Sequence, residues 1–325
     1  MPGFTTHYIF GMKAYNDMPF TPLKHTIAKY RWLYQLGLQG PDMFFYNIPI
    51  LRHRDYRNVG SYMHEHKVNA FFECCLRRIG PIRSRQQQEE AISYLAGFIN
   101  HYIADSICHP YVYGRIGYPV DAPTSMHHGM HAHLENELDA ILLWKYKKKK
   151  PSEFNQTATI CLNGQEIQFI SHFLASCINE TYYPITYRNN FQVTPAMVHR
   201  SIWALRFGCR TLSDKNGKKK FGIAQVESIF VNHPVASAKM VTDSVTDYRS
   251  SCNLNHEAWS NPWDPTRVST ASFVDLFHET LDKCSRVYAL LNSAVTDNMP
   301  LDKQDLSPLL AELGNESYHS GLPVD

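Results

Sequence analysis

The chain has 325 residues, of which 44% are hydrophobic and 19% charged, so it can bury a large core and is neither disordered nor fibrous. Its formal net charge of +2 excludes the broad basic surface of a general nucleic-acid binder, and no stable nucleic-acid partner is expected. No apolar run reaches the roughly 20 residues of a membrane-spanning helix. The N-terminal residues lack a secretory signal pattern, so a cytoplasmic protein is expected.

Helical patterns dominate the first half of the chain. The apolar spacing predicts helices at about 21–37, 62–79, 84–110 and 126–146. The first begins at Thr21-Pro22, an N-cap residue followed by proline at the first helical position. The third is expected to end near Pro110, because proline disfavours helical geometry in the residue before it. His109 is therefore expected to point off the helix end.

The pattern changes after Pro151. Residues 157–162 and 165–169 flank Asn163-Gly164, a dipeptide typical of tight turns, and predict a small β-hairpin insertion near 157–169. Helical patterns return at about 170–182, 195–214, 221–231, 235–247, 272–296 and 304–313. The prediction is an all-α, multi-helix fold. Residues 1–325 are expected to form one helical domain, with a metal-site half at 1–150 and a helical continuation at 151–325.

Cysteine usage excludes a thiolate site. The eight cysteines are scattered and form no CxxC pair, so they are expected to be reduced core thiols and not disulfides or zinc ligands.

Histidines are unusually numerous, 17 in all. His101 and Asp105 stand four residues apart on the third predicted helix, and His131 and Glu135 have the same spacing on the fourth. Residues four apart project from one face of a helix, so each pair can meet one ion. One such pair is more often a surface pair. Two pairs on consecutive helices, with His109 between them in apolar segments, would be costly to bury without a cation. The sequence predicts a metal cluster, and zinc, manganese and iron all remain open on chemical grounds.

These motifs, HYIAD at 101–105 and HAHLE at 131–135, resemble the bacterial zinc-dependent phospholipase C family, which includes the catalytic domain of clostridial alpha-toxin. Further matches are Thr6-His7, Pro41-Asp42 and His64, so the resemblance covers roughly residues 1–146. It implies an all-helical fold that holds three zinc ions. Beyond residue 146 the chain is similar only to uncharacterised intracellular members of the family.

The resemblance implies a ligand set in three parts. One ion would be held by Asp42, His64, His101 and Asp105. A second would be held by His109, His131 and Glu135. Asp105 would bridge to a third ion that His7 also binds. Secreted relatives complete that third site with an N-terminal tryptophan, whereas this sequence starts Met1-Pro2, so two to three zinc ions are expected.

Neighbouring histidines leave the assignment open at two positions. The competitors for the roles of His64 and His131 are His66, His127, His128 and His133. His133 also precedes Glu137 by four residues. The pair of His131 and Glu135 is preferred, because a leucine then stands next to the glutamate as in the family motif. His256 is expected to have a packing role or to support the ligands from behind.

The function implied by the resemblance is hydrolysis of a phosphodiester, with phospholipid as the leading substrate and a peripheral membrane contact as a further expectation. Metal ions lower the pKa of a bound water to about 7, and Asp42 is expected to orient or deprotonate that water. The aromatic run Phe44-Phe45-Tyr46 is a candidate apolar wall. Two alternatives remain: a zinc nuclease or phosphatase, and a metal-stabilised binding protein whose ions have no open coordination position.

Overall fold

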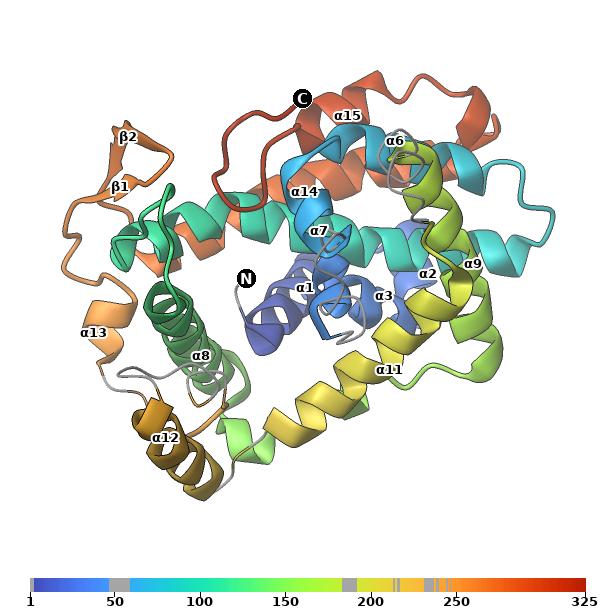
Figure 1. Cartoon of the computed structure of the whole chain (residues 1–325). Helices are drawn as coiled ribbons and strands as arrows, with labels where there is room; N and C mark the ends of the chain where they lie inside the picture. Colours follow the sequence, from blue (N-terminus) through green and yellow to red (C-terminus); the bar gives the residue numbers. More distant parts are fainter. Residues whose placement is uncertain are drawn as a thin grey trace.

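The computed structural model describes residues 3–46, 59–182, 192–212, 214, 217–230, 237, 240–243, 245 and 247–325, with the backbone alone at 228–230. The described residues are mostly helical, which confirms the all-α prediction (Figure 1). Its elements are α1 (Phe4–Asp17), α2 (Pro22–Lys29), α3 (Arg31–Gly37), η1 (Gly40–Tyr46), α5 (Val59–Glu65), α6 (Val68–Ile79), α7 (Arg85–Arg115), α8 (Ser125–Lys147), η2 (Pro151–Glu153), η3 (Gln156–Thr159), α9 (Gly164–Thr181), α11 (Pro195–Leu212), α12 (Lys218–Phe230), α13 (Tyr248–Ser251), β1 (Trp259–Asn261), β2 (Asp264–Ser269), α14 (Phe273–Thr296), η5 (Leu301–Lys303) and α15 (Ser307–Leu313).

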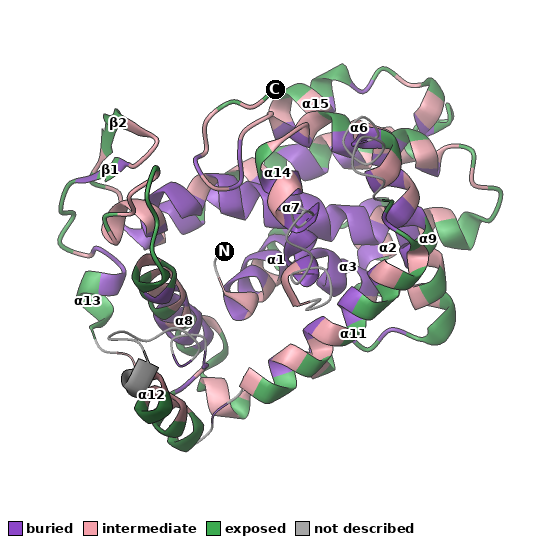
Figure 2. Cartoon of the chain, in the orientation of Figure 1, coloured by how far each residue is buried: buried purple, intermediate pink, exposed green. Residues whose placement is uncertain are grey.

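Helix α7 is the centre of the fold. It contacts α1, α3, α8, α9 and α14, and buried residues line most of its length in Figure 2. A helix that is apolar on all sides is stable only when neighbouring elements surround it. Side chains of α7 therefore reach the interior of the molecule, where the predicted ligands of this helix lie.

Helix α3 crosses α7 at a pair of glycines. A Cβ atom on Gly97 would lie 2.1 Å from the carbonyl oxygen of Tyr34, and one on Gly37 would lie 2.1 Å from that of Tyr94. The two backbones can approach this closely because glycine has no side chain. The crossing holds the chain against α7 immediately before it enters η1, which carries Asp42.

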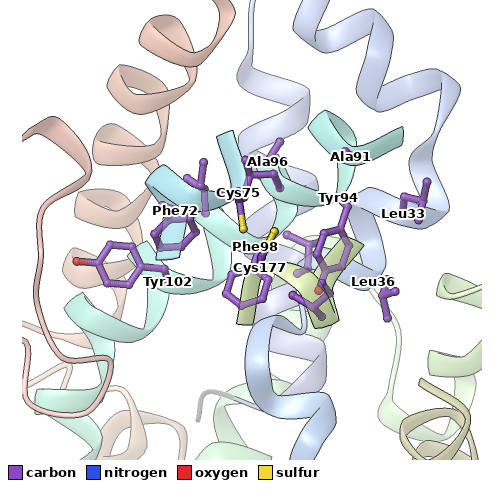
Figure 3. Close-up of a cluster of buried hydrophobic side chains, with 14 of the residues drawn as sticks. Leu33, Leu36, Phe72, Cys75, Ala91, Tyr94, Ala96, Phe98, Tyr102 and Cys177 are labelled. Atoms are coloured by element: carbon purple, nitrogen blue, oxygen red, sulfur yellow. The ribbon is translucent and has the colours of Figure 1, made fainter. Parts of the chain in front are cut away.

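One large apolar cluster fills the space between α3, α6, α7 and α9 (Figure 3). The ring of Phe98 from α7 lies 5.2 Å from that of Phe71 and 5.8 Å from that of Phe72, both on α6. Burying an aromatic side chain of this size contributes about 1.5–3 kcal/mol. All eight cysteines are free thiols and most are buried, which confirms the expectation of reduced core thiols.

Three predicted helices need corrected bounds. The pattern at 21–37 divides at Tyr30 into α2 and α3, and the pattern at 62–79 divides at Lys67, which has φ of 49°, into α5 and α6. Helix α7 does not end near Pro110 but continues to Arg115. Proline costs a helix about 3 kcal/mol. Burial outweighs this cost here, because Tyr111 and its neighbours are enclosed by α14 and β1.

The β-hairpin predicted near 157–169 is wrong. This segment contains η3 and the start of α9. The Asn163 side chain accepts a hydrogen bond from the Glu166 amide at 2.9 Å, and the Glu166 carboxylate accepts one from the Asn163 amide at 2.8 Å. This reciprocal pair is a capping box, so Asn163-Gly164 begins a helix and does not close a hairpin. Among the described residues the only sheet is the antiparallel ribbon of β1 and β2.

The second half otherwise follows the predicted helical pattern, with one exception. The helix expected at 235–247 lies largely outside the described residues, and those described there, 237, 240–243, 245 and 247, are in no α-helix. The single-domain organisation stays a prediction. None of the helices in the described ranges combines the length and apolar character needed to cross a bilayer.

Candidate metal centre

The structure brings the eight predicted ligand residues together in one buried centre. The contributors are α1 with His7, η1 with Asp42, α5 with His64, α7 with His101, Asp105 and His109, and α8 with His131 and Glu135. Of the other four elements, α1, η1 and α8 pack directly against α7, and α5 packs against η1. The centre therefore lies beside the middle of α7.

The first group is formed by Asp42, His64, His101 and Asp105, whose possible ligand atoms all lie within 4.8 Å of one another. His64 Nε2 is 3.2 Å from Asp42 Oδ1, and His101 Nε2 is 3.1 Å from Asp105 Oδ2. Donor atoms at 2.0–2.2 Å from a tetrahedral zinc ion are about 3.3 Å apart. The spacing of this group therefore fits a single zinc ion.

The second group is formed by His109, His131 and Glu135, again within 4.8 Å. Glu135 Oε1 lies 2.6 Å from His131 Nε2 and 3.6 Å from His109 Nε2. The expectation that His109 points off the end of its helix is wrong, because α7 continues beyond it. His109 reaches α8 from within the helix, since it lies four residues after Asp105 and shares its face.

Asp105 lies between the two groups. Its Oδ2 faces His101, while its Oδ1 lies 3.1 Å from His7 Nε2 and 3.7 Å from His109 Nδ1. The His7 ring stacks on that of His101 with the centroids 4.0 Å apart. His7 is part of neither group. The carboxylate offers one oxygen to each side, which is the geometry that a bridging ligand needs.

Backbone carbonyls orient three of the imidazoles. His64 Nδ1 donates to Gly60 O at 2.6 Å, His101 Nδ1 to Leu38 O at 3.1 Å, and His109 Nδ1 to Tyr318 O at 2.6 Å. In each ring Nε2 then faces the centre, buried and without a hydrogen-bond partner among the described residues. Metal-binding histidines are held in this way by a donor bond from the other ring nitrogen. The residues present therefore fit a metal ion.

Gly40 lets the chain pass beside one of these rings. Its φ is +47°, and a Cβ atom there would lie 2.2 Å from His101 Cδ2. Glycine alone meets both demands, because an L side chain is disfavoured at this φ and no room exists for it. Gly40 thus permits the approach of η1 that brings Asp42 to His101.

Burial shifts most of the proton equilibria in the centre. It lowers the pKa of His7 and places the pKa values of His109 and His131 well below the ordinary histidine value. It also raises the pKa of Glu135 well above its usual range. Neutral imidazole is the form of histidine that binds a cation.

Asp105 and His101 respond to charge more than to burial. Burial disfavours the Asp105 carboxylate, but the charges of His109, His101 and His7 hold its pKa well below the ordinary value. Burial also lowers the pKa of His101, yet the carboxylates of Asp105 and Asp42 outweigh it and raise that pKa. The two carboxylates thus favour positive charge at this position, which a divalent cation would supply.

Asp139 of α8 holds the start of α1. Its carboxylate accepts hydrogen bonds from the amides of Thr5 and Thr6 at 3.1 and 2.7 Å, and His7 is the next residue. A negative charge at a helix N-terminus is favourable because free amides point toward it. Sequence reasoning missed Asp139, although it stands four residues after Glu135 on the same face of α8.

Residues 315–324 close one side of the centre, and no local pattern indicates this. The Tyr318 amide donates to His64 O at 2.9 Å, and the Tyr318 carbonyl accepts the hydrogen bond from His109 Nδ1 described above. The His319 ring stacks on His64 with the centroids 4.8 Å apart, and its Nδ1 lies 3.2 Å from Tyr113 Oη. This segment therefore adds a histidine and a tyrosine to the wall of the centre.

The competitors for His64 and His131 lie elsewhere. The His66 ring packs on Tyr62 with the centroids 4.2 Å apart. His127 lies 2.9 Å from the Thr124 hydroxyl through Nδ1 and caps α8, and His128 is exposed.

The alternative pair, His133 and Glu137, points away from both groups. His133 is exposed and lies 3.5 Å from Glu137, whose carboxylate accepts a hydrogen bond from the Ser251 hydroxyl of α13. His256 is half-exposed, and its Nδ1 donates to Thr270 O at 3.0 Å. The geometry therefore favours His131 with Glu135, and His256 supports no ligand directly.

The three aromatic residues after Asp42 have different surroundings. Phe45 has its ring 5.4 Å from that of His64. Phe44 is buried in the core, and Tyr46 packs where a Cβ atom on Gly208 of α11 would be.

A family model described as zinc-dependent phospholipase C matches residues 6–186, which is more than half of the chain and includes all eight ligand residues. Searches among curated proteins and among solved structures found no match. The matched region extends past the motifs of α7 and α8 into α9.

Proposed function

The chain belongs to the zinc-dependent phospholipase C family, and from this premise we propose that it is a zinc-dependent hydrolase of phosphodiester bonds with phospholipid as its substrate. One observation carries the proposal: two buried groups of imidazole and carboxylate side chains lie next to each other, and Asp105 of the first group is 3.7 Å from His109 of the second. An arrangement of this kind would be unstable without cations, since it buries several charges with few hydrogen-bond partners.

The proposed ligands follow the two groups. One zinc ion would be held by Asp42, His64, His101 and Asp105, and a second by His109, His131 and Glu135. A third would lie beside His7 and Asp105. Bound zinc supplies a Lewis acid for the phosphate and lowers the pKa of a water molecule to about 7.

The protein's own side chains supply the rest of the chemistry. We assign to Asp42 the acceptance of a proton from the attacking water, because it is a carboxylate on the edge of the first group and belongs to a short, tightly held turn. Asp42 is buried, with 2% of the residue exposed, so bulk water does not compete for that proton. Phe45 beside His64 and Tyr113 beside His131 provide aromatic walls for the substrate.

Within the part of the chain that the structure describes, the second group consists of three possible protein ligands, which favours a catalytic site over a structural one. A structural zinc ion is closed by four protein ligands, whereas a catalytic one keeps a position for water or substrate.

The test is metal analysis together with hydrolysis assays on one preparation purified without chelators. We expect two to three zinc equivalents, cleavage of a chromogenic phosphodiester and of phosphatidylcholine, and loss of both activities on chelation with recovery on adding zinc. Chelation should also lower the melting temperature, because metal binding stabilises the folded state. His101→Ala should abolish turnover, and His66→Ala, the same change just outside the centre, should not.

The rival functions give different outcomes. Faster cleavage of single-stranded DNA than of phosphatidylcholine would show that the protein is a nuclease instead. Full zinc occupancy in a folded protein that cleaves none of these substrates would establish a structural metal centre and overturn the proposal.

A further inference from the structure

Helices α11 and α12 carry a surface that the metal centre does not use. Trp203 and Phe207 on α11 are 62% and 54% exposed, and Phe221 and Val226 on α12 are 67% and 57% exposed. The rings of Trp203 and Phe207 stack, with the centroids 5.3 Å and the planes 9° apart. Single exposed apolar side chains are ordinary, but four on adjoining helices indicate a contact surface.

The two faces of α11 have different roles. The buried stripe packs on α9 and η1 and consists of Val198, Ile202, Leu205 and Cys209. The outward stripe has the same helical spacing of three and four residues and consists of Arg200, Trp203, Phe207 and Arg210. Figure 2 shows buried and exposed residues alternating along this helix. The aromatic pair is thus flanked by an arginine at each end.

Positive charge is concentrated in this part of the chain. From Pro195 to Glu227 the sequence has seven lysine and arginine residues against two acidic ones, a net charge of +5, whereas the whole chain has +2. The arginines that form ion pairs among the described residues are Arg77, Arg78, Arg85, Arg115, Arg267 and Arg286. Arg200, Arg206 and Arg210 are absent from that set, so their charges are available to an external anion.

A pocket of about 910 Å³ opens between the two helices. Its lining combines apolar side chains, among them Phe207, Ile223 and Val226, with two basic residues, Arg210 and Lys219, and one acidic residue, Glu227. Sites for small molecules have volumes of roughly 300–1,000 Å³. An apolar pocket whose charged lining is positive on balance fits an amphiphile that has an apolar chain and an anionic head.

We propose that this α11–α12 surface, made of Arg200, Trp203, Phe207, Arg210 and Val226, docks the protein on anionic lipid bilayers. Tryptophan and phenylalanine side chains enter the interfacial layer of a membrane, while arginine and lysine attract its anionic lipids.

The position of the surface suits the proposed hydrolase. The buried face of α11 contacts η1, which carries Asp42, so docking would hold the metal centre one helix away from the lipid. The inference rests on the proposed function in one respect, that the substrate is a lipid. Membrane binding itself does not depend on catalysis and is measured separately.

The experiment compares sedimentation of the zinc-loaded full chain with vesicles of phosphatidylcholine alone and with about 30% phosphatidylglycerol. We expect binding to the anionic vesicles and little to the neutral ones. The double variant Trp203→Ala/Phe207→Ala should bind at least about tenfold more weakly, because two aromatic contacts are lost. Arg200→Gln/Arg210→Gln should bind about tenfold or more weakly, and its binding should depend less steeply on salt than that of the wild type.

Phe20→Ala is the matched control, since Phe20 is a 99% exposed aromatic residue outside these helices. It should bind as the wild type does. All variants should keep the wild-type melting temperature and the wild-type rate on a soluble chromogenic phosphodiester. If the wild type does not cleave that substrate, the proposed function fails. The vesicle experiment still shows whether the α11–α12 surface binds membranes.

Two outcomes would overturn the inference. The first is that the wild type binds neutral and anionic vesicles equally or binds neither. The same conclusion would follow if both double variants bound anionic vesicles as tightly as the wild type. The other is a dimer in sedimentation velocity that the Trp203→Ala/Phe207→Ala variant abolishes, without vesicle binding, because the surface would then join two copies of the chain.

Discussion

Asp105 Oδ1 lies 3.1 Å from Nε2 of His7, while the other oxygen of the same carboxylate lies 3.1 Å from His101 Nε2. The carboxylate therefore stands between imidazoles supplied by α1 and by α7. If it bridges ions, its charge stabilises more than one of them.

Asp105→Asn should therefore remove more zinc than Glu135→Gln. Each substitution keeps the size and one oxygen donor of the side chain but removes its charge. Metal analysis of the purified variants measures the ranking. Glu137→Gln is the control, since Glu137 is a buried glutamate on the same helix that faces Ser251. Equal zinc loss from the Asp105 and Glu135 variants would contradict a bridging role.

Asp42→Asn should lower the rate of hydrolysis while the zinc of the second group is kept. If Asp42 accepts the proton of water, the rate should fall by about 10²–10⁴-fold. The second group does not include Asp42, so zinc at His109, His131 and Glu135 should remain. Zinc content and phosphodiester hydrolysis are measured on the same preparation. A variant with an unchanged rate would remove Asp42 from the mechanism.

Asp139→Asn should change how stability depends on pH. Burial raises the pKa of Asp139 in the folded protein to about 6, against about 3.9 for an unfolded chain. Between these values the unfolded chain has released the proton and the folded one retains it, so the unfolding free energy falls as pH rises. From pH 4 to pH 7 the wild type should lose up to about 3 kcal/mol relative to the variant, which cannot ionise.

Urea unfolding of both proteins across this pH range measures the difference. Titration of the histidine ligands affects both proteins alike and cancels in the comparison. Parallel stability curves would show that Asp139 does not ionise in this interval. Asp139→Ala should in addition cost about 1–3 kcal/mol, because it leaves the Thr5 and Thr6 amides without their acceptor.

Gly40→Ala should release zinc from the first group. The added methyl carbon would lie 2.2 Å from His101 Cδ2, so either the ring or η1 must move. Gly117→Ala is the matched control, because Gly117 also has a positive φ, +61°, but a Cβ atom there meets nothing within 4 Å. It should cost only the roughly 1–2 kcal/mol of the left-handed conformation and keep its zinc. Equal zinc content in the two variants would show that His101 tolerates the displacement.

Much of the centre follows from local rules that act along the chain. His101 with Asp105, and His131 with Glu135, share a helix face because the α-helix has 3.6 residues per turn, whatever surrounds it. The apolar pattern likewise predicts α8, whose bounds agree with the expected helix. The resemblance carried by these motifs added His7, Asp42 and His64, and the structure places all three beside Asp105 or His101.

Local rules failed where two of them compete. Asn163-Gly164 is typical of both a tight turn and a helix start, and the reciprocal bonds with Glu166 favour the helix. Proline disfavours a helix at Pro110, and burial of α7 against several other elements outweighs that preference. At Pro110 the deciding energy comes from tertiary contacts that a short sequence window does not weigh, whereas at Asn163 it comes from a capping box that lies within three residues.

The sequence by itself determined the helical class and the two pairs of candidate ligands at helical spacing. Tertiary structure alone decided that His64 and not His66 enters the centre, that Asp139 anchors α1, and that His319 covers His64 from the far end of the chain. The reason is physical. Spacing along a helix is a property of the backbone, whereas the direction in which a helix face points depends on how α1, η1, α5 and α8 pack around α7.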